Sequence, residues 1–170
     1  MKQIAVVGAG TMGNGIAHVF AQTGFSVTLI DVNPGQLTKA MESISKNLDR
    51  QIAKGTITED QKQSTLKNIS TTHDLLKGVA NAELVVEAAT ENIELKLDIF
   101  EEIDKAAPAG CILASNTSSI SITKIAAVTK RPDMVIGMHF MNPVPVMKLV
   151  EIINGYATMK EVTDKIVELS

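Results

Sequence analysis

The chain has 170 residues, of which 45% are hydrophobic and 21% charged, a composition typical of one globular domain with a sizeable core. Its formal net charge of −3, with no block rich in lysine and arginine, argues against a nucleic-acid partner. No apolar run approaches the ~20 residues that a membrane-spanning helix requires, so we expect no membrane insertion. The single cysteine, Cys111, excludes an intrachain disulfide, which fits a reducing, cytoplasmic location. It lies in an apolar run, where we expect a buried, inert thiol.

Apolar segments of strand length alternate with segments of helical period, which predicts an α/β fold. We expect a Rossmann-type, doubly wound, mostly parallel sheet with helices on both faces, forming one domain over residues 1–170. The expected strands cover residues 3–8, 26–31, 69–71, 83–87, 111–115, 134–140 and 148–153. The expected helices cover about 12–23, 34–54, a segment that begins at the capping box Thr58–Gln61, 94–107, 122–128 and a last segment after Thr158.

Pro143 and Pro145 lie close together after the strand that we expect over 134–140. Because two prolines so close cannot sit inside a strand ladder, they predict a turn. The strand over 148–153 then returns antiparallel at the edge of the sheet. The last expected helix is still running at Ser170, and we therefore expect the chain to be a truncated piece of a longer protein.

A glycine-rich segment follows the first expected strand with the spacing G-x-G-x-x-G. By itself this spacing is also compatible with an ordinary glycine turn. Here a helix and a second strand follow in order, and Asp31 ends that strand, where an acidic side chain meets an adenosine ribose. Asp31 would repel a 2′-phosphate, which favours NAD over NADP. The sequence therefore predicts NAD bound at the helix N-terminus by Gly8, Ala9, Gly10, Thr11, Met12 and Gly13.

Three polar features lie at the carboxyl ends of expected strands, where open parallel sheets bind ligands. They are the hydroxyl-rich segment 114–119, His139 and Glu151. The segment alone is typical of a polar turn or a helix cap. Glu151 lies in an otherwise apolar strand and needs a partner, and the turn at Pro143 brings it beside His139. The pair predicts either a general acid/base couple facing the ligand crevice or a structural ion pair.

Four stretches of the sequence resemble the L-3-hydroxyacyl-CoA dehydrogenase family, and within it bacterial enzymes for 3-hydroxybutyryl-CoA. They are GAGTMGNGIA at 8–17, VVEAATEN at 85–92, ASNTSS at 114–119 and MHFMNPVPVMKLVEII at 138–153. The resemblance covers the N-terminal NAD-binding domain of the family and not its helical C-terminal domain. It implies an NAD-dependent oxidoreductase of fatty acid and butanoate metabolism that interconverts a (3S)-3-hydroxyacyl-CoA and the 3-oxoacyl-CoA. It also implies a homodimer or higher homo-oligomer, and little or no activity of this chain alone.

The resemblance implies roles for individual residues as well. His139 matches the catalytic base, Glu151 the carboxylate that orients it, and Ser118 the serine that binds the reacting oxygen of the substrate. The matched residues of the NAD site, besides the glycine-rich segment, are Asp31, Glu91, Lys96, Asn116 and Asn142, the last two in the nicotinamide pocket. Lys54 matches a lysine that contacts coenzyme A, and Asn47 stands where some members carry serine.

Two alternatives remain at this point. One is a dehydrogenase of a free hydroxy acid or sugar acid, which would have no use for a coenzyme A contact at Lys54. The other is an NAD-binding module without catalysis. We interpret His18 and His73 as structural or solvated, and no spacing of cysteine and histidine suggests a metal site.

Overall fold

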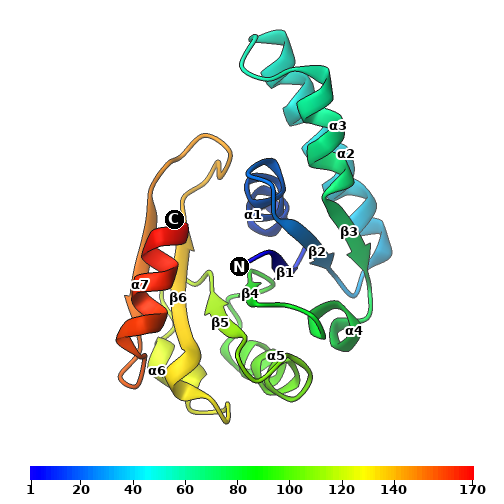
Figure 1. Cartoon of the computed structure of the whole chain (residues 1–170). Coiled ribbons are helices and arrows are strands. Elements are labelled where there is room, and N and C mark those ends of the chain that lie inside the picture. Colours follow the sequence, from blue (N-terminus) through cyan, green and yellow to red (C-terminus); the bar gives the residue numbers. More distant parts are fainter.

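The computed structural model describes residues 1–170 as one twisted sheet with helices against both of its faces (Figure 1). The strands are β1 (Gln3–Val7), β2 (Ser26–Ile30), β3 (Ile69–Thr72), β4 (Leu84–Glu87), β5 (Ile112–Ser115), β6 (Val135–Phe140) and β7 (Val150–Asn154). Their order is β3-β2-β1-β4-β5-β6-β7, and every neighbouring pair is parallel except β6 and β7. The predicted Rossmann-type sheet with an antiparallel edge strand is confirmed.

Seven α-helices and one short 3₁₀-helix connect these strands. They are α1 (Thr11–Gln22), α2 (Pro34–Ala53), α3 (Glu59–Lys67), α4 (Leu75–Val79), α5 (Ile93–Ala106), α6 (Ile122–Ala126), η1 (Pro132–Met134) and α7 (Lys160–Leu169). The α2–α3 hairpin packs on α1 and projects beyond the sheet (Figure 1). The sequence did not predict α4 and η1, whose few residues carry no helical period. None of the helices is both long and apolar enough to cross a lipid bilayer.

The hydrophobic core consists of two layers, one on each face of the sheet. Along β1, Ile4 and Val6 belong to the layer under α1 and α7, whereas Ala5 and Val7 belong to the layer under α4, α5 and α6. A strand buried on both faces is apolar at every position, which explains the continuous apolar runs in the sequence. Cys111 lies in the second layer, so its expected burial is confirmed. Burial raises the pKa of its thiol to about 12, which favours the unreactive thiol form.

Local sequence fixes where the helices of the projecting hairpin begin. The Asn33 side chain accepts a hydrogen bond of 2.9 Å from the Gly35 amide, with Pro34 in the first turn of α2. At the start of α3, the Gln61 amide donates to the Thr58 hydroxyl at 3.2 Å, and the Thr58 amide donates to the Gln61 side chain at 2.8 Å. The predicted capping box is therefore confirmed.

The edge strand β7 begins two residues later than the sequence predicted. The expected strand covered 148–153, whereas β7 covers Val150–Asn154. The turn after β6 is longer than the two prolines suggested, because the amides of Val146 and Met147 both donate to the Pro143 carbonyl at 3.0 Å. The predicted reversal itself is correct, and it places His139 directly opposite Glu151 in the β6–β7 ladder.

His18 lies on the buried side of α1 with no exposed surface, while His73 is exposed. Neither ring nitrogen of His18 has a hydrogen-bond partner. Of the two interpretations, the solvated one therefore applies to His73, and burial excludes it for His18. Burial lowers the pKa of the His18 imidazole, and the neighbouring Gln22 side chain acts in the opposite direction.

We predict that His18 makes the fold sensitive to acid. The unfolded chain takes up a proton on His18 near its usual pKa of about 6.5, whereas the folded chain takes it up only at lower pH. The unfolded state thus binds more protons below about pH 6.5, and the free energy of unfolding falls as the pH drops. Urea denaturation above and below this pH should show a smaller fall for His18→Gln than for the unsubstituted chain. His73→Gln is the exposed control, and an unchanged fall in His18→Gln would contradict the prediction.

Candidate active site

The glycine loop, residues 8–13, joins β1 to α1 with little room around two of its glycines. Gly8 has φ of 96°, and a Cβ there would lie 2.6 Å from the Ala89 Cα. A Cβ on Gly13 would lie 1.7 Å from the Gly8 carbonyl oxygen, so only glycine lets α1 approach β1 this closely. Gly10 instead faces open space, and no side chain caps the N-terminus of α1. Free backbone N–H groups beside an open backbone form a binding site for a pyrophosphate.

Asp31 follows β2 and holds the glycine loop from the side. Its Oδ2 accepts a hydrogen bond of 2.8 Å from the Ala9 amide, and its Oδ1 accepts one of 2.9 Å from the Asn33 amide. Beside it lies a cavity of about 450 Å³ with a mostly hydrophobic lining that includes Val32 and Leu95. A carboxylate next to an apolar cavity suits a ribose and its adenine. The loop, Asp31 and this cavity therefore fit NAD.

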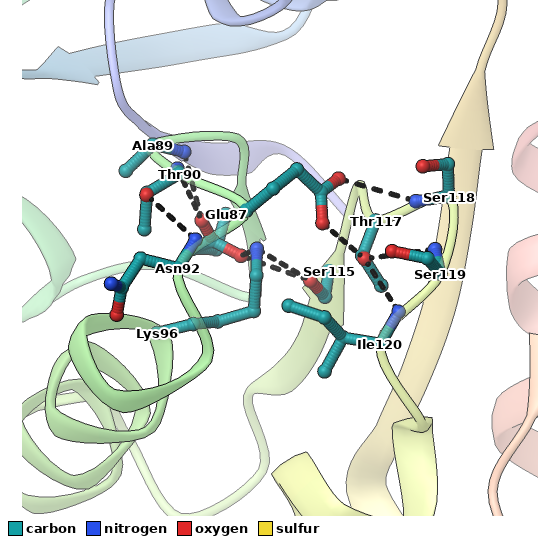
Figure 2. Close-up of polar contacts among 11 residues, drawn as sticks. Glu87, Ala89, Thr90, Asn92, Lys96, Ser115, Thr117, Ser118, Ser119 and Ile120 are labelled. Atoms are coloured by element: carbon teal, nitrogen blue, oxygen red, sulfur yellow. Dashed lines mark hydrogen bonds and ion pairs between the residues drawn. The ribbon is translucent and has the colours of Figure 1, made fainter.

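A buried carboxylate, that of Glu87 at the end of β4, organises the next part of the site (Figure 2). Its Oε1 accepts hydrogen bonds from the amides of Ala89 at 2.8 Å and Thr90 at 3.4 Å. Its Oε2 forms an ion pair with the Lys96 ammonium and accepts a hydrogen bond of 2.9 Å from the Ser115 hydroxyl. Glu87 thus connects β4, the loop after it, α5 and β5.

Lys96, which the resemblance places in the NAD site, has no exposed surface in this conformation. Its ammonium contacts Glu87 and also lies 3.3 Å from the Ser115 hydroxyl oxygen (Figure 2). The charge of Lys96 is therefore neutralised inside the protein, and a direct contact with a cofactor would require its side chain to move.

Glu91 joins the loop after β4 to the hydroxyl-rich segment after β5. Its Oε2 accepts a hydrogen bond of 2.8 Å from the Thr117 hydroxyl, and its Oε1 accepts one of 3.3 Å from the Ser118 amide. The Thr117 hydroxyl also accepts from the amides of Ser119 and Ile120, at 3.3 and 3.1 Å (Figure 2). These contacts fix the backbone at Ser118 and leave its side chain exposed.

His139 and Glu151 face each other across β6 and β7. The His139 Nδ1 lies 2.7 Å from the Glu151 Oε2, while its Nε2 makes no hydrogen bond. Both side chains line a cavity of about 330 Å³ together with Ser118. When Nδ1 donates its proton to the carboxylate, Nε2 carries a free lone pair and can accept a proton from a ligand in this cavity.

The two asparagines of the expected nicotinamide pocket differ in their environment. Asn116 is buried after β5, and its Oδ1 accepts a hydrogen bond of 2.9 Å from the Phe140 amide, which ties β5 to the end of β6. Its Nδ2 makes no hydrogen bond within the protein, so that donor is free for a ligand. Asn142 is exposed in the turn after β6 and has no side-chain hydrogen bond.

Lys54 and Asn47 lie apart from His139, at the far part of α2. They line a separate cavity of about 630 Å³ between that helix and the turn Pro143–Val146. The structure thus brings together the candidate NAD residues and the candidate catalytic residues along the carboxyl edge of the sheet, and it places the two candidate coenzyme A residues on the projecting hairpin.

Sequence reasoning missed Glu87 and Thr117 as members of the site. For Glu87 a signal was present, because it ends the apolar run of β4 just as Glu151 interrupts the apolar run of β7. A carboxylate at the end of a buried strand needs partners, so the reasoning that pairs Glu151 with His139 holds for Glu87 as well. Thr117 lies within a segment of several hydroxyl residues, and nothing in its sequence position distinguishes the one that holds Glu91.

Comparisons with known proteins agree with this geometry. The family model of the 3-hydroxyacyl-CoA dehydrogenase NAD-binding domain matches residues 3–170. The chain is 49% identical over 158 residues to 3-hydroxybutyryl-CoA dehydrogenase of Bradyrhizobium diazoefficiens, covering 93% of this chain and 54% of that protein. It is 44% identical to 3-hydroxybutyryl-CoA dehydrogenase of Clostridioides difficile, covering 99% of this chain and 59% of that protein.

Among solved structures, (S)-3-hydroxybutyryl-CoA dehydrogenase of Ralstonia eutropha superposes with a TM-score of 0.96 at 45% identity, over 99% of this chain and 59% of that one. The chain therefore spans little more than half the length of these relatives. A family model that matches nearly every residue, together with a glycine loop and an acid that fit NAD, leads to one conclusion. The chain belongs to the 3-hydroxyacyl-CoA dehydrogenase family and is an NAD-binding domain of that family.

Proposed function

We propose that this chain is the NAD-binding part of an enzyme that interconverts a (3S)-3-hydroxyacyl-CoA and the corresponding 3-oxoacyl-CoA, with 3-hydroxybutyryl-CoA as the expected substrate. The observation that carries the proposal is the 2.7 Å contact between His139 and Glu151, in a cavity that Ser118 also lines. An oriented imidazole beside a hydroxyl donor, at the carboxyl edge of an NAD-binding sheet, is what oxidation of an alcohol requires.

Each of the three side chains has one task in the proposed reaction. His139 removes the proton of the substrate hydroxyl through Nε2, and it returns that proton in the reverse direction. Glu151 holds the ring through Nδ1, so that Nε2 faces the substrate. The Ser118 hydroxyl donates a hydrogen bond to the reacting oxygen, where charge develops. NAD, when bound, supplies the nicotinamide that exchanges a hydride with the substrate carbon.

The proposed cofactor contacts are those of the glycine loop, Asp31, Glu91, Lys96, Asn116 and Asn142. Within this set, the free N–H groups at the start of α1 would bind the pyrophosphate, and the Asn116 Nδ2 has a free donor for the carboxamide end of the cofactor. In the structure Glu91 accepts hydrogen bonds from Thr117 and Ser118, and Lys96 pairs with Glu87. A direct contact of Glu91 or Lys96 with NAD stays a prediction.

The whole enzyme is proposed to be longer than this chain and to assemble as a homo-oligomer. Relatives of the family extend well beyond the matched region, and the resemblance implies that their helical C-terminal domain closes the substrate crevice and makes most of the dimer contact. In support, the cavity beside His139 and Glu151 is open, with Ser118 and Glu151 both exposed.

We predict that the chain binds NAD more tightly than NADP, because the Asp31 carboxylate repels a 2′-phosphate. Asp31→Asn keeps an oxygen that can accept from the Ala9 amide and removes the charge, so it should narrow the difference between the two dissociation constants. Calorimetric titration of the chain with each cofactor measures both values. Asp60→Asn, an exposed acid at the start of α3, is the control. NADP binding as tight as NAD in the unsubstituted chain would contradict the prediction.

We predict that His139→Gln lowers kcat by roughly 10²–10⁴-fold, the usual effect of losing a positioned base, and has little effect on NAD affinity. Glu151→Gln should lower kcat by a smaller factor, because the ring keeps a hydrogen-bonding neighbour but loses the charge that holds it. The measurement is NADH oxidation with acetoacetyl-CoA, in a chimaera of this chain and the C-terminal part of the Bradyrhizobium diazoefficiens relative. Unchanged turnover in His139→Gln would refute its role, with His73→Gln as the control.

The same assay tests the proposed function and the contribution of the relative's C-terminal part. We expect the chimaera to reduce acetoacetyl-CoA and the 170-residue chain alone to bind NAD with little or no turnover, because an open crevice does not hold hydride donor and acceptor at reacting distance. No turnover by a folded, NAD-binding chimaera would contradict the proposed function. Equal kcat/KM for the chain and the chimaera would show that this domain is catalytically complete.

A further inference from the structure

The cavity of about 330 Å³ beside His139 and Glu151 continues past this pair toward the end of β7. In the β6–β7 ladder, Gly137 and Ile153 are the next pair on the same face as His139 and Glu151. Side chains two residues apart on a strand point to the same face, so Ile153 faces the cavity on the same side as Glu151. A ligand that extends from the imidazole along the strands therefore meets Ile153, which lines the cavity.

Gly137 leaves the room that Ile153 occupies. It is buried in β6, and a Cβ built on it would lie 2.9 Å from the Ile153 Cβ and 3.1 Å from the Ile122 Cδ1. A side chain at this position would therefore push Ile153 away from the strand. Ile122, at the start of α6, is buried, whereas Ile153 keeps 38% of its surface exposed. An apolar surface thus remains open two residues beyond Glu151.

This apolar surface stands out because the rest of the cavity is polar. The apolar lining consists of three isoleucines, Ile120, Ile122 and Ile153, and every other lining residue is polar. Ile120 is half-buried and Ile122 buried, so Ile153 offers the most exposed apolar side chain of the cavity. A hydrocarbon chain gains free energy by covering such a surface, and a polar group does not. The cavity at Ile153 therefore favours an alkyl group.

The far wall of the cavity is held in place by hydrogen bonds. The Thr123 hydroxyl of α6 accepts a hydrogen bond of 2.9 Å from the Tyr156 amide, and the Asn154 Oδ1 accepts one of 2.9 Å from the Thr163 hydroxyl of α7. Thr123 and Asn154 both line the cavity. Asn154 lies three residues beyond Glu151, which is about 10 Å along a strand. The apolar surface thus lies between the proposed reaction centre and a fixed wall.

The direction of this cavity matches the part of the substrate that lies beyond the reacting carbon. The coenzyme A residues that the resemblance implies, Lys54 and Asn47, line a different cavity beside the turn after β6, and the two cavities share no residue. His139 precedes that turn, so in the proposed reaction the reacting carbon lies between the two cavities. In a 3-hydroxyacyl-CoA, the coenzyme A arm and the alkyl end leave the reacting carbon in opposite directions. The cavity at Ile153 is therefore available for the alkyl end.

We propose that Ile153 binds the alkyl end of the acyl chain and determines how strongly acyl chains longer than four carbons bind. The ligand class is a coenzyme A thioester whose acyl chain continues beyond the 3-position as a saturated hydrocarbon. This inference rests on the proposed function, since it names a specificity-determining residue for the same substrate. A four-carbon chain ends one methyl group beyond the reacting carbon, and each further methylene covers more of Ile153.

Calorimetric binding of two unreactive thioesters, butanoyl-CoA and hexanoyl-CoA, tests the proposal on the chain itself. Hexanoyl-CoA should bind the unsubstituted chain about 10-fold more tightly than butanoyl-CoA, because two more methylenes are covered. Ile153→Asn should reduce this gain to about 2-fold, since its polar side chain no longer offers a hydrocarbon surface. Ile153→Val, which removes one methyl-sized group and stays apolar, should reduce the gain by less.

Val167→Asn is the matched control, because Val167 is an exposed apolar residue of α7 outside this cavity. An undiminished gain in Ile153→Asn would overturn the proposal, as would the absence of a gain in the unsubstituted chain or an equal loss in Val167→Asn. A purely structural effect would weaken both thioesters by the same factor, and that result would overturn it as well. Binding does not depend on turnover, so failure of the proposed function in the acetoacetyl-CoA assay is distinguishable from failure at Ile153.

Discussion

The buried carboxylate of Glu87 is the group through which the loops of the site are connected. It accepts hydrogen bonds from two amides of the loop after β4, and it pairs with Lys96 of α5 and Ser115 of β5. The loop that it holds is the one that Gly8 approaches so closely that no side chain fits between them. A displaced Glu87 would therefore disturb the glycine loop as well. Losing one partner of such a buried pair typically costs about 3–5 kcal/mol.

The antiparallel edge strand β7 gives the site a cross-strand contact between Glu151 and His139 that parallel pairing alone would not give. In the parallel part, each strand delivers its last residues to the same edge, and the NAD-binding loops gather there. β7 runs the other way, so Glu151 reaches His139 from the opposite direction and becomes its direct cross-strand neighbour. A register slip of one residue would turn Glu151 to the other face of the sheet. The β6–β7 register is thus as important for the proposed chemistry as the identity of the two residues.

How much of this molecule can be predicted from its sequence depends on whether the signal is local. The glycine turn between β1 and α1, the capping box at Thr58 and the alternation of strands with helices are local patterns, and all of them appear in the structure as expected. The His139–Glu151 contact is not local, but a charged residue in an apolar strand and a proline turn together were enough to predict it. The start of β7 was missed because the turn contains its own backbone hydrogen bonds, which no proline count reveals.

Two basic residues, Lys96 and Arg50, show why the partner of a charged side chain could not always be predicted from the sequence. Lys96 stands between two leucines on α5 and Arg50 between two polar residues on α2, and neither setting reveals which partner the fold brings to the charge. In the structure, the charge of Lys96 is neutralised by Glu87 in the interior. Arg50 is exposed, oriented by Asn47 and free of any acid, so its charge remains available. The difference comes from the fold around each side chain, because Lys96 reaches a buried carboxylate whereas Arg50 reaches only the side-chain oxygen of Asn47.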